Sequence, residues 1–205
     1  MSPNFMPQFI SFFCYNIARS IFSLGFRVLP ILNALDLSVG IRVFDAACGY
    51  GYMAKHLSRC DYVGMDNDSE RIEWARKTPG ENARRKFLVG NICRTGLPLK
   101  SFDRALGYGV LHHLDDKEVH LFANELNGLV RGRIVFSEPV YSRYHFINNW
   151  LCRLDAGKYV RQTDEYLNLL RPILNITRSE FFYARNGLAK FLLITCEPKE
   201  NQAHV

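Results

Sequence analysis

The stretch VFDAACGYGYM, residues 43–53, places an acid and two glycines directly after an apolar run. Gly49, Gly51 and Ala54 satisfy the pattern G-x-G-x-x-A, in which glycines let the backbone approach a ligand closely. Asp66 ends the next apolar run, where a carboxylate can accept hydrogen bonds from ribose hydroxyls. These residues predict a strand–loop–helix site for a nucleoside, and they fit a dinucleotide as well as a nucleoside without phosphate.

Asp45 distinguishes between these two ligands by its charge. It lies four residues before Gly49, where the apolar run meets the loop. A diphosphate is bound by backbone N–H groups and a helix N-terminus, and a carboxylate on its approach path repels it. S-adenosylmethionine carries an ammonium and a sulfonium but no phosphate, so Asp45 can hold the ammonium directly or through water. Asp45 therefore favours S-adenosylmethionine over a dinucleotide.

Three further titratable residues follow later apolar runs and are candidates for proton transfer. His112 and His113 stand in VLHHLDD, and imidazole titrates near neutral pH. Glu138 stands before Pro139 at the end of another run and could orient an acceptor. Each of the three also has a structural interpretation, as a packing or capping residue.

The elements that must position these residues alternate in type along the chain. Short apolar runs and helical patterns follow one another from Gly40 onward, which is typical of a doubly wound α/β domain with a mostly parallel sheet and helices on both faces. Strands are predicted at 41–46, 61–66, 85–90, 102–109 and 133–139. Helices are predicted at 51–59, 68–77 and 116–130, the second capped by Asp68.

The alternation stops after Pro139. Residues 140–178 are aromatic-rich and have a helical pattern, with a break at Gly157. Two strand-like runs then flank Asn186-Gly187, a pair preferred in type I′ hairpin turns. The sequence predicts one domain, made of an N-terminal helical segment (1–39), a nucleotide-binding core (40–139), a helical insertion (140–178) and a C-terminal hairpin (179–197).

These motifs resemble those of class I S-adenosylmethionine-dependent methyltransferases. VFDAACGYG is similar to the family's first motif, although Ala47 stands where the family usually has a glycine. Asp66 in VGMDND matches the ribose-binding acid, and Asn91 in FLVGNI stands where an aspartate commonly holds the adenine amino group. YGVLHHLDD is similar to a segment of small-molecule members. The resemblance extends over residues 40–139 and, in outline, 177–197, and it implies a seven-stranded Rossmann-like sheet.

The resemblance also implies which residues bind each ligand. The cofactor S-adenosylmethionine, released as S-adenosylhomocysteine, would contact Asp45, Ala47, Cys48, Gly49, Gly51, Asp66, Asn67, Asn91, Ile92, Gly107 and Tyr108. Family members usually build the acceptor pocket from the N-terminal helix and the insertion, which here offers Tyr141, Tyr144, His145 and Arg161. Transfer from a sulfonium depends mainly on positioning, with a base needed only for a protonated acceptor.

The resulting hypothesis is a methyltransferase (EC 2.1.1.-) acting on a small aromatic, polyketide-like or lipid-linked acceptor. A second hypothesis is methylation of nucleic acid or protein, but the sequence has no NPPY or DPPY stretch of the kind typical of members that methylate a base's exocyclic amine. A dinucleotide-dependent oxidoreductase is disfavoured by Asp45 and by the lack of a Tyr-x-x-x-Lys pair after the fourth predicted strand. A methyltransferase-like partner subunit without catalysis stays open because of the departures at Ala47 and Asn91.

Composition sets the remaining expectations. The net charge of +6 permits anionic partners, yet the densest basic run, ARRKF, is short, so no specific nucleic-acid partner is expected. The six cysteines have no metal-ligand spacing, which predicts no metal site and favours a reducing cytoplasm. Residues 5–30 are apolar but interrupted by Arg19 and Arg27, and they predict a helix. This helix would pack on the core or over the ligand site, or else make peripheral membrane contact or meet an apolar substrate.

Overall fold

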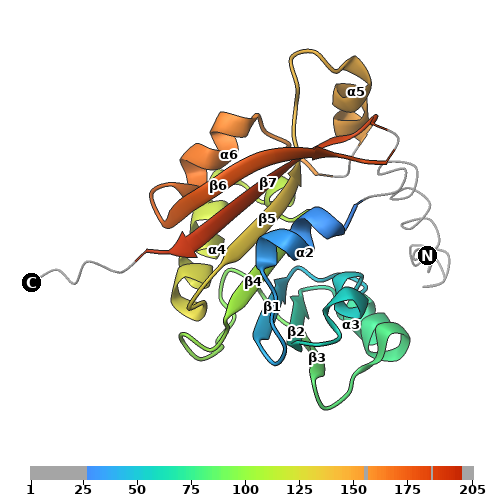
Figure 1. Ribbon diagram of the computed structural model, residues 1–205, viewed down its shortest axis with the longest axis vertical. Helices are drawn as coiled ribbons and strands as arrows, with labels where there is room; N and C mark the ends of the chain where they lie inside the picture. Colours follow the sequence, from blue (N-terminus) through green and yellow to red (C-terminus); the bar gives the residue numbers. More distant parts are fainter. Residues whose placement is uncertain (1–26, 155–156, 186, 200–205) are drawn as a thin grey trace, which may run out of the picture.

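The computed structural model describes residues 27–154, 157–185 and 187–199. A seven-stranded sheet crosses the molecule in the order β3-β2-β1-β4-β5-β7-β6 (Figure 1). Strands β1 to β5 run parallel, whereas β7 is antiparallel to both of its neighbours, β5 and β6. The predicted α/β class, with a mostly parallel sheet and an antiparallel C-terminal hairpin, is confirmed.

The five parallel strands lie close to their predicted positions. They are β1 (Arg42–Ala46), β2 (Asp61–Asp66), β3 (Arg85–Val89), β4 (Arg104–Tyr108) and β5 (Ile134–Pro139). Their apolar runs are short and continuous because both faces of the sheet are covered. Reversal of the strand order between β1 and β4 leaves a crevice at their carboxyl ends, which is where open α/β sheets bind ligands.

Helices cover both faces of this sheet. On one face α4 (Asp116–Leu129) and α6 (Thr163–Leu170) close a core around Phe44, Phe122 and Phe136. On the other face α2 (Leu29–Leu35) and α3 (Ser69–Ala75) close a second core with Val43 and Leu57. Asp68 caps α3 as predicted, because its side chain accepts hydrogen bonds from the N–H groups of Glu70 and Arg71.

The helix predicted at 51–59 is wrong in type and length. The segment after the glycine loop forms only the 3₁₀ helix η1 (Met53–Leu57). Positive φ angles at Ala47, Gly49 and Gly51 extend the loop into the residues that would have formed the first helical turn. The chain after α3 is also irregular, with a π-helical turn η2 (Arg76–Gly80) that contains Pro79.

The C-terminal third differs from its prediction in its boundaries. Helices α5 (Phe146–Leu154) and α6 occupy the predicted helical segment, but β6 (Leu174–Tyr183) begins before residue 178 and pairs with β7 (Lys190–Pro198). The last strand pair is Tyr183 with Lys190, so the connection is longer than the predicted two-residue turn, whose Asn186 lies outside the described residues.

Most of the N-terminal segment for which membrane contact is predicted, 5–30, lies outside the described residues. Its described end begins α2, in which Pro30 occupies the first turn. Within the part of the chain that the structure describes, no helix has the length and apolar character needed to cross a membrane.

Candidate functional site

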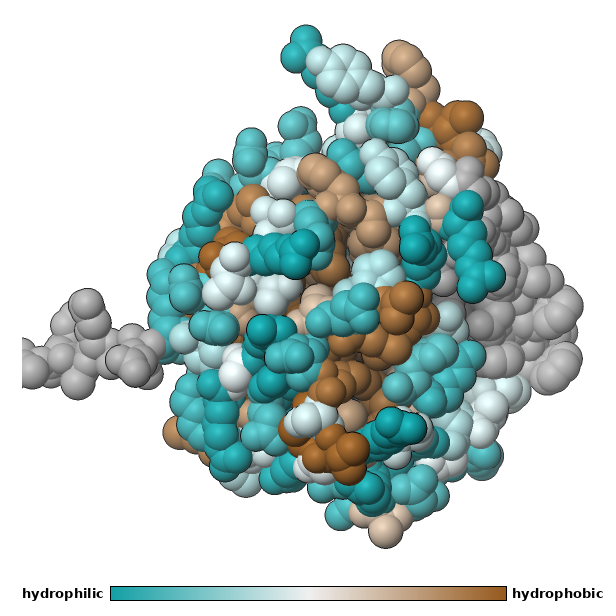
Figure 2. Space-filling view, in the orientation of Figure 1, coloured by the Kyte–Doolittle hydropathy of each residue, from teal (hydrophilic) through white to brown (hydrophobic). Residues whose placement is uncertain are grey.

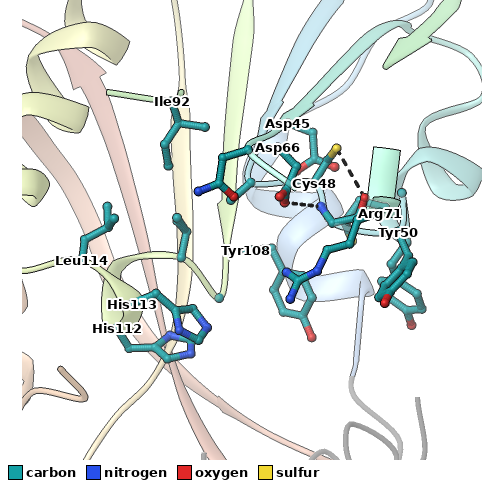
Figure 3. A pocket seen from close by; sticks show the side chains of 18 of the residues that line it. Asp45, Cys48, Tyr50, Asp66, Arg71, Ile92, Tyr108, His112, His113 and Leu114 are labelled. Atoms are coloured by element: carbon teal, nitrogen blue, oxygen red, sulfur yellow. Dashed lines mark hydrogen bonds between the residues drawn. The ribbon is translucent and has the colours of Figure 1, made fainter. Parts of the chain in front are cut away.

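A cavity of about 1190 Å³ opens at the carboxyl ends of the parallel strands. The loop after β1, the end of β2 and the residues after β3 line one part of it, and the residues after β4 together with α5 and β7 line another. Figure 3 shows Asp45, Cys48 and Asp66 grouped on one side of the cavity and His112 and His113 on the other, with Tyr108 between them. A site of this size exceeds what one drug-sized ligand needs.

Backbone N–H groups of the glycine loop donate hydrogen bonds to acceptors within the protein. The N–H group of Cys48 donates to the carbonyl of Met65 (3.0 Å), and that of Gly51 donates to the carbonyl of Cys48 (2.9 Å). The N–H group of Gly49 donates to the carboxylate of Asp66 (2.8 Å). These three N–H groups are paired within the protein, so the loop does not hold them open for a phosphate.

Two positions of the loop show why small residues are needed there. A Cβ atom on Gly51 would lie 2.9 Å from the ring of Phe87 and 2.9 Å from Pro79, at a φ of +72°. Ala47, which stands where the family usually has glycine, adopts a φ of +57°. The left-handed backbone of Ala47 costs free energy that a glycine would not.

Asp66 connects the loop to β2. One carboxylate oxygen accepts from Gly49 N–H and the other accepts from Asp68 N–H (3.0 Å), and the side chain is buried at the cavity wall. Each oxygen keeps a second lone pair for a ligand donor. Asp66 therefore both fixes the loop and faces the cavity, as its predicted contact with ribose requires.

Asp45 is buried beneath the loop and also lines the cavity. Its carboxylate accepts a hydrogen bond of 2.6 Å from the hydroxyl of Tyr62 on β2. Burial raises the pKa of Asp45 from 3.8 to about 7, the Tyr62 hydrogen bond lowers it, and the nearby Asp66 charge raises it again. The site thus contains an anion that is costly without a positive neighbour.

Of the remaining residues predicted to bind the cofactor, some line the cavity and one does not. Asn67, Asn91 and Ile92 line the cavity, but the side-chain carbonyl of Asn91 already accepts from Cys93 N–H (2.8 Å). Gly107 does not line the cavity, which corrects its predicted place in the cofactor site. It lies within the sheet, where an added Cβ would be 2.8 Å from Phe136.

Glu138 has a different place from the one predicted. Its side chain is 0% exposed and does not line the cavity. Its carboxylate instead accepts from the N–H groups of Val110 and Leu111 (both 2.9 Å) and His112 (3.3 Å), all in the segment after β4. Because it is enclosed by these donors, Glu138 cannot touch an acceptor, and its predicted catalytic role is corrected to a positioning role.

The fourth partner of Glu138 is the ring of His112, with 2.6 Å between Nδ1 and the carboxylate. A carboxylate partner favours the tautomer with hydrogen on Nδ1, so Nε2 is the basic nitrogen. His112 and His113 both line the cavity, and their ring centroids lie 4.2 Å apart. The close approach of Gly157, where a Cβ would come within 2.0 Å of the His112 ring, holds that ring in place.

The predicted acceptor residues of the insertion do not line this cavity. Tyr144 is 80% exposed, Tyr141 is half-buried, and His145 packs on the ring of Tyr183. Arg161 is buried and donates to the carbonyls of Leu111 and Leu114 and to Asp116, so it fastens the segment after β4. The insertion lines the cavity through other residues, Asn148, Leu151 and Cys152 of α5.

Several lining residues escaped the sequence analysis. They are aromatic or cationic side chains around the loop and at the hairpin: Tyr50, Tyr52, Lys55, Arg71, Trp74, Lys190 and Phe191. Arg71 pairs with Asp68 and lies over the ring of Tyr50. Arg71 could have been predicted from the sequence, because it lies in the first helical turn after Asp66. Lys190 could not, because it approaches the cavity only through the pairing of the hairpin with β5.

Comparison with known proteins finds matches to the part of the chain that carries the glycine loop and to the fold. Residues 43–132 match the family described as methyltransferase domain. A geranyl diphosphate C-methyltransferase from Streptomyces coelicolor A3(2), in complex with Mg²⁺, geranyl diphosphate and S-adenosyl-L-homocysteine, has 16% identity and a TM-score of 0.67, over 82% of this chain and 78% of that chain. A SAM-dependent methyltransferase from Methanosarcina mazei has 19% identity and a TM-score of 0.66, over 82% and 96%. No curated protein matches the sequence significantly.

At these identities the structural matches establish the fold, and the domain match covers 90 of the 205 residues. The matched residues 43–132 contain β1 to β4, the glycine loop, Asp66 and α4. Residues 43–132 are therefore similar to methyltransferase domains, and the sheet as a whole has the fold of S-adenosylmethionine-dependent methyltransferases.

Proposed function

We propose that the protein binds S-adenosylmethionine at the glycine loop and transfers its methyl group to a small, largely apolar acceptor held between the residues after β4, α5 and β7. The observation that carries the proposal is the use of the loop N–H groups of Cys48, Gly49 and Gly51 within the protein. With those donors occupied, the site recognises a ligand through carboxylates, which suits a cationic nucleoside without phosphate.

The residues of the site fit this ligand in three respects. Asp66 has lone pairs for ribose hydroxyls. Burial raises the pKa of Asp45, so a ligand ammonium beside this carboxylate would stabilise its charged form. The 3₁₀ helix η1 has only five residues and supplies little of the dipole that a diphosphate exploits at an α-helix. A dinucleotide-dependent oxidoreductase is therefore the weaker alternative.

When bound, S-adenosylmethionine supplies a methyl group on a positively charged sulfur. Asp66 and the glycine loop would bind the nucleoside, and Tyr108 would lie between the loop and the two histidines. His112, held by Glu138 through Nδ1, would take the proton of a hydroxyl or amine acceptor at Nε2. Enclosure by α5 and β7 would exclude water and fix the acceptor in position.

The walls of the acceptor side indicate its chemistry. Leu114, Leu121, Leu151 and Phe191 are apolar. Lys190 also lines the cavity, and its ammonium lies over the ring of Phe181, 3.5 Å from the ring centroid. The S. coelicolor structure holds geranyl diphosphate, an apolar chain with an anionic group. The combination of apolar walls with Lys190 supports an acceptor of similar character here, whether aromatic, polyketide-like or lipid-linked.

Ligand binding is tested by calorimetric titration with S-adenosylmethionine, S-adenosylhomocysteine, NADH and NADPH. We expect only the first two to bind, and we expect Asp66→Asn to weaken them by about 1.5–3 kcal/mol because a charge-assisted acceptor is lost. The control is Asp164→Asn, an exposed aspartate in the first turn of α6. Binding of NADH, or unchanged affinity in Asp66→Asn, would refute the proposed site.

Transfer is tested with a labelled methyl donor against geranyl diphosphate and a series of phenols and hydroxylated lipids. Once an acceptor is found, His112→Ala should lower kcat by about 10²–10⁴-fold for an oxygen or nitrogen acceptor, while donor affinity stays unchanged. His120→Ala, an exposed histidine on α4, is the matched control. Full activity of His112→Ala would remove the proposed base. Donor binding without transfer to any acceptor would favour the alternative of a non-catalytic partner subunit.

The proposed location is the cytoplasm. None of the cysteines in the described part of the chain forms a disulfide, and Cys48 lies in the loop that would contact the ligand. Buried thiols at such positions are compatible with a reducing compartment.

A further inference from the structure

Helix α5 has two apolar faces with different surroundings. Asn148, Leu151 and Cys152 are buried and line the cavity. On the opposite face Phe146 is 84% exposed and Trp150 is 60% exposed, with Ile147 also exposed beside them. A nine-residue helix that already packs on the protein through one face would normally carry polar residues on the other.

The exposed residues of α5 continue onto the C-terminal hairpin. The ring of His145 lies 5.9 Å from that of Tyr183, and Leu151 packs with Ala184 and Ala189. Tyr144, Phe146, Ile147 and Trp150, together with Tyr183 and Leu188 of the hairpin, form what we term the α5–hairpin face. Figure 2 shows apolar side chains at the upper edge of the molecule, where Figure 1 places α5.

The charged side chains that the structure describes around the α5–hairpin face are cationic, while Asp155 of the same stretch of sequence lies outside the described residues. Arg143, Arg153, Lys158 and Arg185 are exposed around it. Among the described residues of 140–161 and 181–196, no side chain is acidic. Scattered apolar residues are normal on a protein surface, but exposed aromatic and aliphatic side chains bordered by cations are typical of contacts with an anionic lipid surface.

We propose that the α5–hairpin face docks on an anionic lipid bilayer, with Phe146, Ile147 and Trp150 inserted at the headgroup level and the surrounding cations on the lipid phosphates. Tryptophan and tyrosine favour this depth because they combine an apolar ring with a polar atom. Since the inner face of α5 lines the cavity, docking would bring the acceptor side of the cavity close to the bilayer. The docking itself does not depend on the proposed methyl transfer.

The proposal is tested by flotation of the full-length protein with vesicles of phosphatidylcholine alone and of phosphatidylcholine with phosphatidylglycerol. We expect the protein to float with the anionic vesicles and to be released by raised salt. Phe146→Ser with Trp150→Ser should lower partitioning at least about tenfold. Arg143→Glu with Arg153→Glu should remove the preference for anionic vesicles.

The matched control is Val39→Ser with Leu99→Ser, two apolar residues that are 75% and 77% exposed elsewhere on the surface. Its partitioning should equal that of the unchanged protein, and thermal melts should show that all variants are folded. Equal flotation of the Phe146/Trp150 variant and the unchanged protein overturns the proposal, as does the absence of flotation of the unchanged protein. A change from dimer to monomer in the free Phe146/Trp150 variant, measured by light scattering, would overturn it in favour of contact between two copies.

Discussion

Replacement of Asp45 by asparagine should make the protein less sensitive to pH. Asp45 is buried and its pKa rises from 3.8 to about 7, first because burial disfavours its charge. The native state therefore retains a proton that the unfolded chain releases once the pH passes 3.8. Stability contributed by this proton is full below 3.8, falls as the pH rises and stops falling above about 7. The asparagine side chain would keep an oxygen that can accept from the Tyr62 hydroxyl and would carry no titrating group.

The magnitude follows from the two pKa values. Each pKa unit corresponds to about 1.4 kcal/mol, so the whole interval from 3.8 to about 7 amounts to about 4 kcal/mol. Part of this loss has already occurred at pH 5. Between pH 5 and pH 8 the unchanged protein should lose about 2–3 kcal/mol relative to Asp45→Asn.

The assay is urea unfolding of both proteins, without ligand, at intervals from pH 5 to pH 8. Only the difference between the two free energies of unfolding is compared, because titrating groups remote from Asp45 contribute equally to both proteins. Asp164→Asn serves as a control whose difference from the unchanged protein should be flat. If the difference for Asp45→Asn changes by less than about 0.5 kcal/mol across this range, Asp45 does not carry the raised pKa, and the electrostatic reasoning about the site fails.

Four more perturbations test the same region. If a ligand ammonium lies beside Asp45, calorimetric affinity for S-adenosylhomocysteine should rise up to about tenfold per pH unit below pH 7 and level off above it, with proton release seen in buffers of different ionisation enthalpy. Ala47→Gly should stabilise the protein to urea by about 0.5–1 kcal/mol, since the left-handed backbone suits glycine; a loss of stability would contradict this. Gly51→Ala should cost at least about 2 kcal/mol because its Cβ would meet Phe87; an unchanged urea midpoint would contradict the loop geometry. Glu138→Ala should cost about 3–5 kcal/mol by urea unfolding, as buried donors lose their acceptor; near-neutral behaviour would refute its positioning role.

The strands were predictable because local pattern and final environment agree. The runs at 41–46, 61–66 and 133–139 are short, apolar and bounded by polar residues, and all three became central strands. The helix predicted at 51–59 was wrong because of the backbone conformation of the loop, which the residue types alone do not reveal. Loop residues at 47, 49 and 51 with positive φ leave only five residues for η1 before β2 must begin.

The two ends of the site differ in how much the sequence revealed. The proposed donor end depends on residues close in sequence to one loop and one strand end, and Asp45, Gly49 and Asp66 all line the cavity. The proposed acceptor end depends on which side chains of α5 and of the hairpin are oriented toward the cavity. The aromatic residues that stand out in the sequence, such as Tyr144, are exposed, while the less conspicuous Leu151 and Cys152 reach the cavity from the inner face of the helix.

The internal hydrogen bonds of the glycine loop bear on both stability and recognition. Cys48 and Gly51 donate to backbone carbonyls and Gly49 donates to Asp66, so the loop is closed without any ligand. A phosphate would have to displace these bonds and also approach the carboxylates of Asp45 and Asp66, which is unfavourable on both counts. A ligand that brings hydroxyl donors and a positive charge needs neither change, and it also stabilises the buried Asp45 in its charged form. The same arrangement that lets the loop fold empty thus selects a cationic nucleoside over a phosphorylated one.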